Sequence, residues 1–94
     1  MEMHNPAHPG EILNGWIEEL DLSITAFALH LGISRVMLSR ILNGHAAVTA
    51  DMDLRLSEAL GTSQGFWLRM QGQRDLWIAK QRTNERLPVE RLAA

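Results

Sequence analysis

Two arginines five residues apart, Arg35 and Arg40, carry side chains well suited to recognising a base pair. A guanidinium group can donate two parallel hydrogen bonds to O6 and N7 of guanine, which discriminates against other bases by about 1–3 kcal/mol. Val36 could contact a thymine methyl group, and His45 could meet a phosphate just beyond this segment. The alternatives are that both arginines are ordinary solvated side chains and that Val36 only covers a turn.

These residues belong to the stretch from Phe27 to Gly44, FALHLGISRVMLSRILNG, whose pattern is typical of two short helices joined by a tight turn. Gly32 ends the first helix, because a left-handed backbone there costs glycine no Cβ clash. Ser34 caps the second helix, which is expected to run to Asn43 and to stop at Gly44. The second helix is therefore the element that must present the arginines.

This second helix is predicted to have two different faces. At about 100° per residue, one side is an apolar stripe that would be buried, made of Leu38, Ile41 and Leu42. The opposite side is formed by Val36, Arg40 and Asn43, with Ser39 beside them and Arg35 at the flank of the N-terminus. Such a helix can enter a major groove, with its N-terminal residues near base edges and its first amides aimed at a phosphate.

Similar signals place three further helices, so the predicted fold class is all-α with five helices. Pro9 opens the first helix and Ser23 caps the second. Thr49 caps a fourth helix that ends at Gly61, and Ser63 is expected to cap a fifth over about 64–81. No alternating β-branched run predicts a strand.

Composition bounds the class of protein. Ninety-four residues with 46 % hydrophobic content predict one packed domain over 9–82, preceded by a loose arm, 1–8, and followed by a tail, 83–94. The lack of cysteine excludes disulfides and thiolate metal sites, and no signal peptide or apolar run of about 18 residues is present, which predicts a cytoplasmic protein without a membrane span. The net charge of -2 disfavours coating of nucleic acid by bulk charge. A local basic patch around Arg35 and Arg40 must act instead.

Metal binding and catalysis are both disfavoured. His4 and His8 have the i, i+4 spacing of metal ligands, but Pro6 breaks the helix that would align them and no HExxH motif adds ligands. No glycine-rich phosphate loop and no serine with a positioned histidine and acid can be found. We therefore expect no metal, no cofactor and no enzyme activity.

The fifth helix is predicted to be apolar on two sides, which is unusual for a helix facing only one core. Its outer residues Leu68 and Leu76, together with Trp77, are expected to form a two-fold dimer interface. Such a homodimer would hold two base-reading helices about 34 Å apart on double-stranded DNA. The alternative is that these three residues simply close the bundle.

Several blocks of sequence resemble the HigA-type antitoxins, within the larger group of lambda-repressor-like helix-turn-helix domains. The blocks span residues 9 to 78 and are PGEIL at 9–13, LGISR at 31–35, SRILNG at 39–44, LGTS at 60–63, FWL at 66–68 and DLW at 75–77. The helix-turn-helix pattern is only moderately specific, but the last two blocks narrow the resemblance considerably.

This resemblance implies a homodimeric autorepressor that also neutralises a RelE-like, ribosome-dependent mRNA-cleaving toxin of the HigB type. Base-facing positions of the family match Arg35, Val36, Ser39 and Arg40, and phosphate-contacting positions match Ser34 and Asn43. One departure is Ile24, where relatives usually carry a glutamine that helps to hold the DNA backbone. One phosphate contact is therefore open to question.

Two other functions remain possible on the sequence alone. A stand-alone repressor from a phage or mobile element would share the same reading helix and need no toxin. A protein-interaction module with vestigial DNA binding gains support from Ile24 and the acidic net charge. The tail, 83–94, and the N-terminal arm are equally open as toxin contacts.

Overall fold

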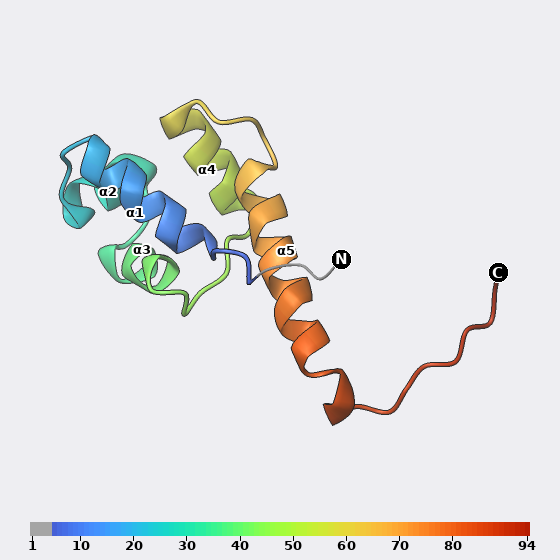
Figure 1. The fold of residues 1–94 in the computed structure, drawn as a ribbon. Coiled ribbons are helices and arrows are strands. Elements are labelled where there is room, and N and C mark those ends of the chain that lie inside the picture. The colour runs from blue at the N-terminus through green and yellow to red at the C-terminus, as the bar shows by residue number, and fades with distance from the viewer. Residues whose placement is uncertain (1–4) are drawn as a thin grey trace.

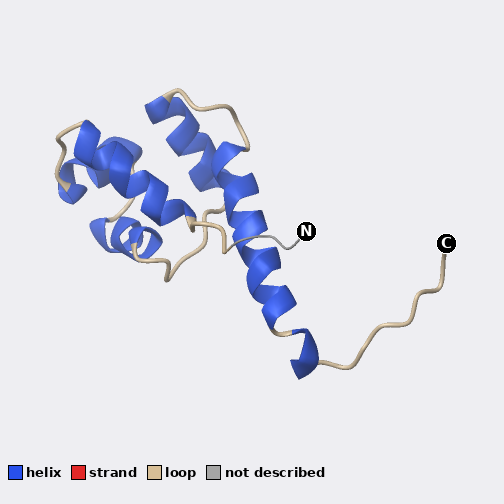
Figure 2. Cartoon of the chain, in the orientation of Figure 1, coloured by secondary structure: helices blue, strands red, loops and turns tan. Residues whose placement is uncertain are grey.

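A computed structural model describes residues 5–94, and every regular element in that range is helical (Figure 1; Figure 2). Five α-helices are followed by one short 3-10 helix, η1. Their bounds are α1 Pro9–Glu19, α2 Ile24–Leu31, α3 Arg35–Leu42, α4 Ala50–Leu60, α5 Phe66–Gln81 and η1 Thr83–Glu85. The prediction of an all-α domain with five helices is confirmed.

Most helix boundaries follow from chemistry within a few residues of the boundary. The side-chain oxygens of Ser23, Ser34 and Thr49 accept hydrogen bonds from the amides three residues further on, at 3.0, 3.0 and 3.2 Å. Gly32 and Gly61 end α2 and α4 with φ of 75°, in the left-handed region that favours glycine. These five predicted caps are confirmed.

The start of α5 differs from the prediction that Ser63 caps it. The helix begins at Phe66, and the residue before it, Gly65, has φ of 91° and no side chain with which to cap it. The carboxylate of Asp53, on α4 and only 3 % exposed, takes this role. It accepts hydrogen bonds from three amides at the start of α5, those of Gly65 at 2.6 Å, Trp67 at 2.9 Å and Leu68 at 3.1 Å.

The hydrophobic core lies between the first four helices and the N-terminal half of α5. Its fully buried large side chains include Leu13, Phe27, Leu38, Leu56 and Trp67. On α1, Leu13 and Ile17 are buried in this core, whereas Ile12 is 39 % exposed. Beyond the core, the C-terminal half of α5 projects away from the other helices (Figure 1).

Two side chains of α5 hold it against the rest of the domain. The Gln71 side-chain oxygen accepts a hydrogen bond of 3.0 Å from the amide of Val48, in the loop after α3. Arg74 donates from Nη1 to the carbonyl of Pro6 at 2.9 Å and to the side chain of Asn5, and its guanidinium lies 5.6 Å from the ring centre of Trp77. The orientation of α5 is thereby fixed relative to both segments.

Candidate nucleic-acid interface

The chain bends by 110° between α2 and α3, within the range of about 90–120° expected for a helix-turn-helix. The turn is short because Gly32 ends α2 and Ser34 already caps α3. No single helix among residues 5–94 is long and apolar enough to cross a membrane. Only α2 and α3 taken together meet that criterion of length and composition, and they do so across this bend.

Arg55 on α4 forms a hydrogen bond to the turn between α2 and α3. Its Nη1 donates a hydrogen bond of 2.8 Å to the carbonyl of Leu31, the last residue of α2, whose oxygen has no partner within the helix. Its Nε donates to the carboxylate of Asp51 at 2.8 Å, and this contact raises the pKa of Arg55. The bend is therefore fixed by a side chain distant in sequence from the turn, which the motif alone did not reveal.

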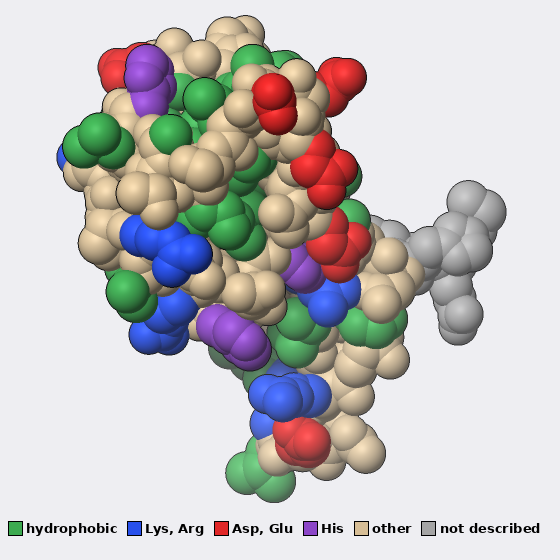
Figure 3. All heavy atoms as spheres, turned by 90° about the vertical axis from the view of Figure 1, so that its left-hand side faces the viewer, with side chains coloured by type: hydrophobic (Ala, Val, Ile, Leu, Met, Phe, Trp, Pro, Cys, Tyr) green, Lys and Arg blue, Asp and Glu red, His purple; other side chains and the backbone are tan. Residues whose placement is uncertain are grey.

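The two predicted faces of α3 are present. Leu38, Ile41 and Leu42 are buried in the core, as predicted. The opposite face is exposed to solvent. Its exposed side chains are those of Arg35, Val36, Arg40 and Asn43, of which Val36 is 69 % exposed, and Ser39 beside them is half-buried. On the view of Figure 3, basic side chains gather at the middle and lower left, whereas acidic side chains line the upper right. The surface is lopsided in charge although the net charge is negative.

The N-terminus of α3 is suited to holding an anion. Ser34 Oγ accepts the amide hydrogen of Met37 at 3.0 Å, which leaves the hydroxyl proton able to donate to a phosphate. The first two helical amides, those of Arg35 and Val36, have no acceptor within the helix. Together with the positive end of the helix dipole, these donors match what a DNA phosphate requires.

Intramolecular hydrogen bonds orient two of the exposed polar side chains. Arg40 Nη2 donates to the carbonyl of His45 at 3.1 Å, and the guanidinium group has further N–H donors that this hydrogen bond does not use. Asn43 Nδ2 donates to the carbonyl of Ser39 at 2.9 Å and lies 3.5 Å from its hydroxyl oxygen. These contacts reduce the side-chain entropy that either residue would lose on meeting DNA.

The C-terminal end of α3 is fixed by close contact with α1. A Cβ on Gly10 would lie 2.3 Å from the carbonyl oxygen of Ile41 and 2.6 Å from that of Leu42, so the two helices touch backbone to backbone. His8 caps α1 here, its Nδ1 accepting from the amide of Gly10 at 3.1 Å. The sequence predicted only the start of a helix in this region. A glycine such as Gly10 can mark a close approach of two backbones, and this contact was not predicted.

His45, predicted to meet a phosphate, is exposed in the loop after α3. Its amide donates to the carbonyl of Arg40 at 2.8 Å, so the backbone of this loop is held against the end of the helix. The residue lines a hollow of about 230 Å³ that is bordered by His8 and, on α5, by Gln71 and Arg74. His45 is thus placed at the edge of the α3 surface rather than on its face.

The remaining sequence expectations concern Ile24 and the histidines. Ile24 is the first residue of α2 and packs half-buried against the core, so its side chain stabilises the domain. No group of three metal-binding side chains occurs within residues 5–94. His4, which the sequence paired with His8, lies outside the described residues.

The three residues expected to form a dimer interface do not share one face of α5. Leu68 and Leu76 are 40 % and 59 % exposed and lie about 80° apart around the helix. Trp77 is half-buried beneath Arg74 and lies about 180° from Leu68. A second helix packed on the outer face of α5 would therefore meet the two leucines and not the tryptophan.

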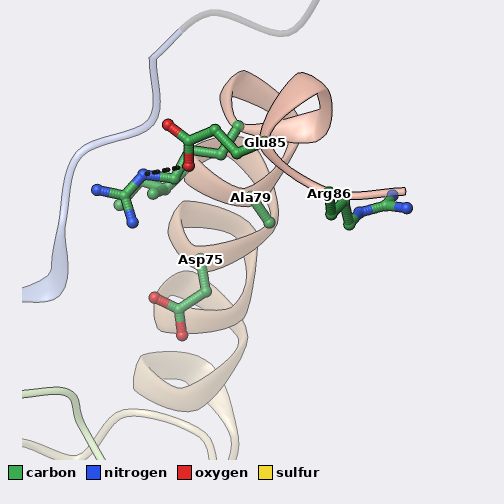
Figure 4. Close-up of a pocket in the computed structure, with 6 residues that line it drawn as sticks. Asp75, Ala79, Glu85 and Arg86 are labelled. Carbon is green, nitrogen blue, oxygen red and sulfur yellow. Dashed lines mark ion pairs between the residues drawn. The ribbon is translucent and has the colours of Figure 1, made fainter. Parts of the chain in front are cut away.

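Near the end of α5 the surface is hollowed, with a volume of about 460 Å³. Figure 4 shows this hollow, where Arg82 and Glu85 form an exposed ion pair of 3.9 Å and Asp75 and Ala79 project from the helix. Its lining consists of Asp75, Ile78, Ala79, Arg82, Glu85 and Arg86. The hollow is formed by α5 and η1 and lies apart from α3.

A 110° bend, a buried inner face and an exposed polar outer face on the second helix define a helix-turn-helix DNA-binding regulator. The family described as Helix-turn-helix matches residues 16–64 of the chain. Antitoxin HigA-1 of Vibrio cholerae serotype O1 is 33 % identical over 81 residues, which cover 85 % of this chain and 76 % of that relative.

Solved structures agree with this assignment. One described as "antitoxin GraA in complex with its operator" matches with a TM-score of 0.86 and 39 % identity, covering 100 % of this chain and 98 % of the other. The Pseudomonas aeruginosa "antitoxin HigA with higBA promoter" matches with a TM-score of 0.77 and 34 % identity, over 90 % and 99 % of the two chains. The chain belongs to the HigA-type antitoxins of the helix-turn-helix family, which are DNA-binding regulators and not a class of enzyme.

Proposed function

We propose that this protein binds the operator of its own gene in the cytoplasm and neutralises a RelE-like, mRNA-cleaving toxin of the HigB type. The observation that carries the proposal is the exposed face of α3, which places two arginines on the second helix of a helix-turn-helix. Relatives solved with an operator and with a promoter support the DNA half of the proposal. The name antitoxin among the relatives supports the toxin half.

Each residue of the proposed interface has a distinct role. Arg35 and Arg40 read guanine by paired hydrogen bonds, Val36 contacts a thymine methyl group, and Ser39 hydrogen-bonds to a base edge. Three further residues contact phosphates and set the register of the helix on the duplex: Ser34, Asn43 and His45. The half-buried Ile24 supplies no such contact at the start of α2.

A homodimer is part of the proposal, because an operator with two half-sites requires two reading helices about 34 Å apart. The exposed leucines of α5, Leu68 and Leu76, provide its interface. Trp77 contributes indirectly, since it lies with Arg74 on the side of α5 that faces the N-terminal segment.

Electrophoretic mobility shift with the promoter of the protein's own gene tests the DNA half. Arg35→Ala and Arg40→Ala are each expected to weaken binding by about 5- to 150-fold, the equivalent of about 1–3 kcal/mol per paired contact. Arg86→Ala is the control, since it removes the same charge from the far end of the molecule. If both α3 variants bind as the parent does, with unchanged circular dichroism, α3 is not the reading helix.

Co-expression tests the toxin half. The product of the gene next to this one should arrest growth and cleave ribosome-bound mRNA when expressed alone, and both effects should disappear when this protein is co-expressed. A neighbouring product that neither arrests growth nor co-purifies with this chain would leave a repressor without a toxin.

A further inference from the structure

The exposed side of α1 carries apolar groups that the core does not enclose. Ile12 is 39 % exposed, and Trp16, about one turn further on, is half-buried. Gly15 and Glu19 lie beside them on the same side of the helix, and a Cβ placed on Gly15 would meet no atom within 4 Å. Gly15, Trp16 and Glu19 line a hollow of about 300 Å³. We call these four residues the α1 outer face.

The α1 outer face is surrounded by negative charge. Glu11 and Glu18 lie on its edge, Asp21 follows in the turn after the helix, and all three are exposed. No lysine or arginine precedes Arg35 in the chain. In the part of the chain that the structure describes, Glu18 and Glu19 form no ion pair. The charge of this face is therefore available to a partner of opposite sign.

Charge complementarity selects the partner. DNA and RNA are polyanions, so the α1 outer face repels them. The toxin of the proposed function acts on mRNA, and a protein surface that contacts RNA must be basic in order to neutralise phosphates. Such a surface is attracted to α1 and repelled by the arginines of α3. Opposite charges on two surfaces speed their encounter and disfavour other partners.

The hollow has a chemistry suited to an arginine side chain. An arginine can lay its planar group against the Trp16 ring and donate hydrogen bonds to the Glu19 carboxylate. Gly15 leaves room for the stem of that arginine, because it has no side chain of its own. An apolar side chain in the same hollow would cover Glu19 without pairing its charge. An arginine of the partner therefore fits the hollow better than an apolar group does.

The C-terminal tail, 83–94, lacks this selectivity. Its apolar side chains Leu87, Val89 and Leu92 are almost fully exposed. The tail contains two arginines and two glutamates, so it has no net charge that would select a basic partner. It therefore provides a control for the test of α1.

We propose that the toxin docks on the α1 outer face, with one of its arginines between the Trp16 ring and the Glu19 carboxylate, over Gly15. The proposal rests on the toxin binding of the proposed function and assigns a surface to it. None of the residues of the α1 outer face belongs to the exposed face of α3. Toxin docking and DNA binding therefore use different side chains.

Surface plasmon resonance tests this surface, with the full chain immobilised and the purified product of the neighbouring gene as the analyte. Glu19→Lys should raise the dissociation constant about tenfold or more, because it sets a like charge against the docked arginine. The difference from the parent should shrink at high salt, which screens charges. Glu90→Lys makes the same change of charge in the tail and should leave the constant within about threefold of the parent.

Gly15→Gln gives a second readout in which folding and docking move in opposite directions. Glutamine should raise Tm by about 2–8 °C, because glycine is disfavoured inside a helix and this position is open. It should nevertheless raise the dissociation constant about tenfold or more, because its side chain occupies the hollow. A weaker complex of this variant is then not a result of unfolding.

The possible results separate the surface from the function. If the parent binds and both α1 variants bind equally well, the surface is overturned and the proposed function stands. Equal weakening by Glu19→Lys and Glu90→Lys also overturns the surface, because the toxin would then respond to net charge or to the tail. A neighbouring product that does not bind the parent overturns the toxin half of the proposed function and this proposal with it. Mobility shifts with the gene's own promoter should be the same for all three variants and the parent.

Discussion

Asp53 is expected to be the side chain on which the position of α5 depends most. Its carboxylate is 3 % exposed and accepts three amide hydrogens from the first turn of α5, including that of Gly65 at 2.6 Å. Asp53→Asn keeps the shape of the side chain but replaces one acceptor oxygen with a donor and removes the charge. An amide nitrogen facing the Gly65 N–H would then leave that partly buried donor without its acceptor.

The expected cost can be worked out from the separate contributions. A donor left without an acceptor costs about 1–3 kcal/mol, with the upper end reached when it is fully buried, and loss of a carboxylate at a helix N-terminus costs about 0.3–1 kcal/mol, up to about 2 when partly buried. Together these predict a loss of about 1–5 kcal/mol from a domain whose free energy of unfolding is expected to be about 5–14 kcal/mol. Because 1 kcal/mol shifts Tm by about 4–8 °C in a domain of this size, a loss of about 3 kcal/mol, the middle of this range, should lower Tm by about 12–24 °C.

Urea and thermal unfolding followed by circular dichroism measure this loss, at one protein concentration because a dimer makes Tm concentration-dependent. Asp51→Asn is the matched control: it lies in the first turn of the same helix, but its carboxylate is exposed and bonds only to Arg55 among the contacts described. It should cost less than about 1 kcal/mol. If the two variants lose equal stability, Asp53 does not hold α5 in the manner described.

Three further predictions follow from the contacts around α3. Gly10→Ala should destabilise the domain by about 1–3 kcal/mol and weaken operator binding, whereas Gly15→Ala, whose Cβ meets nothing within 4 Å, should stabilise it by about 0.5–1 kcal/mol; equal melting temperatures would contradict the contact between α1 and α3. Ser34→Ala and Thr49→Ala should each cost about 1 kcal/mol as lost caps, but only the former should also reduce operator affinity in a mobility shift. Arg55→Ala should weaken operator binding by loosening the turn, and an affinity equal to that of the parent would show that the turn needs no support from α4.

Local chemistry explains why most helix boundaries were predictable. Caps such as Ser34 act on amides three residues away, and Gly32 marks a backbone conformation that glycine adopts without strain. The start of α5 was not predictable in this way, since its cap comes from Asp53, twelve residues before Gly65 in the chain. Ser63 had the right residue type for a local cap, and the tertiary contact replaced it.

In the candidate site, too, the features set by local sequence were predictable and the features set by tertiary contacts were not. Helical periodicity was sufficient to separate the buried Leu38 from the exposed Arg40, because a 3.6-residue repeat assigns faces directly. Periodicity does not report how a helix is held in space. The contact of Gly10 with the end of α3 and the hydrogen bond from Arg55 to the turn arise only when distant segments meet.

The hydrogen bond between Gln71 and Val48 connects α5 to the loop after α3, so a change in the position of one is expected to affect the other. Val48 lies in the loop after α3, and Gln71 lies on α5. If a partner tilted α5, it would strain this hydrogen bond and move the loop, and DNA bound against the loop would resist the tilt. Thermodynamic linkage requires these two effects to have the same coupling free energy. Substitution of the Gln71 side chain is therefore expected to alter this coupling, and it also removes the hydrogen bond of 3.0 Å from Gln71 Nε2 to Asp75.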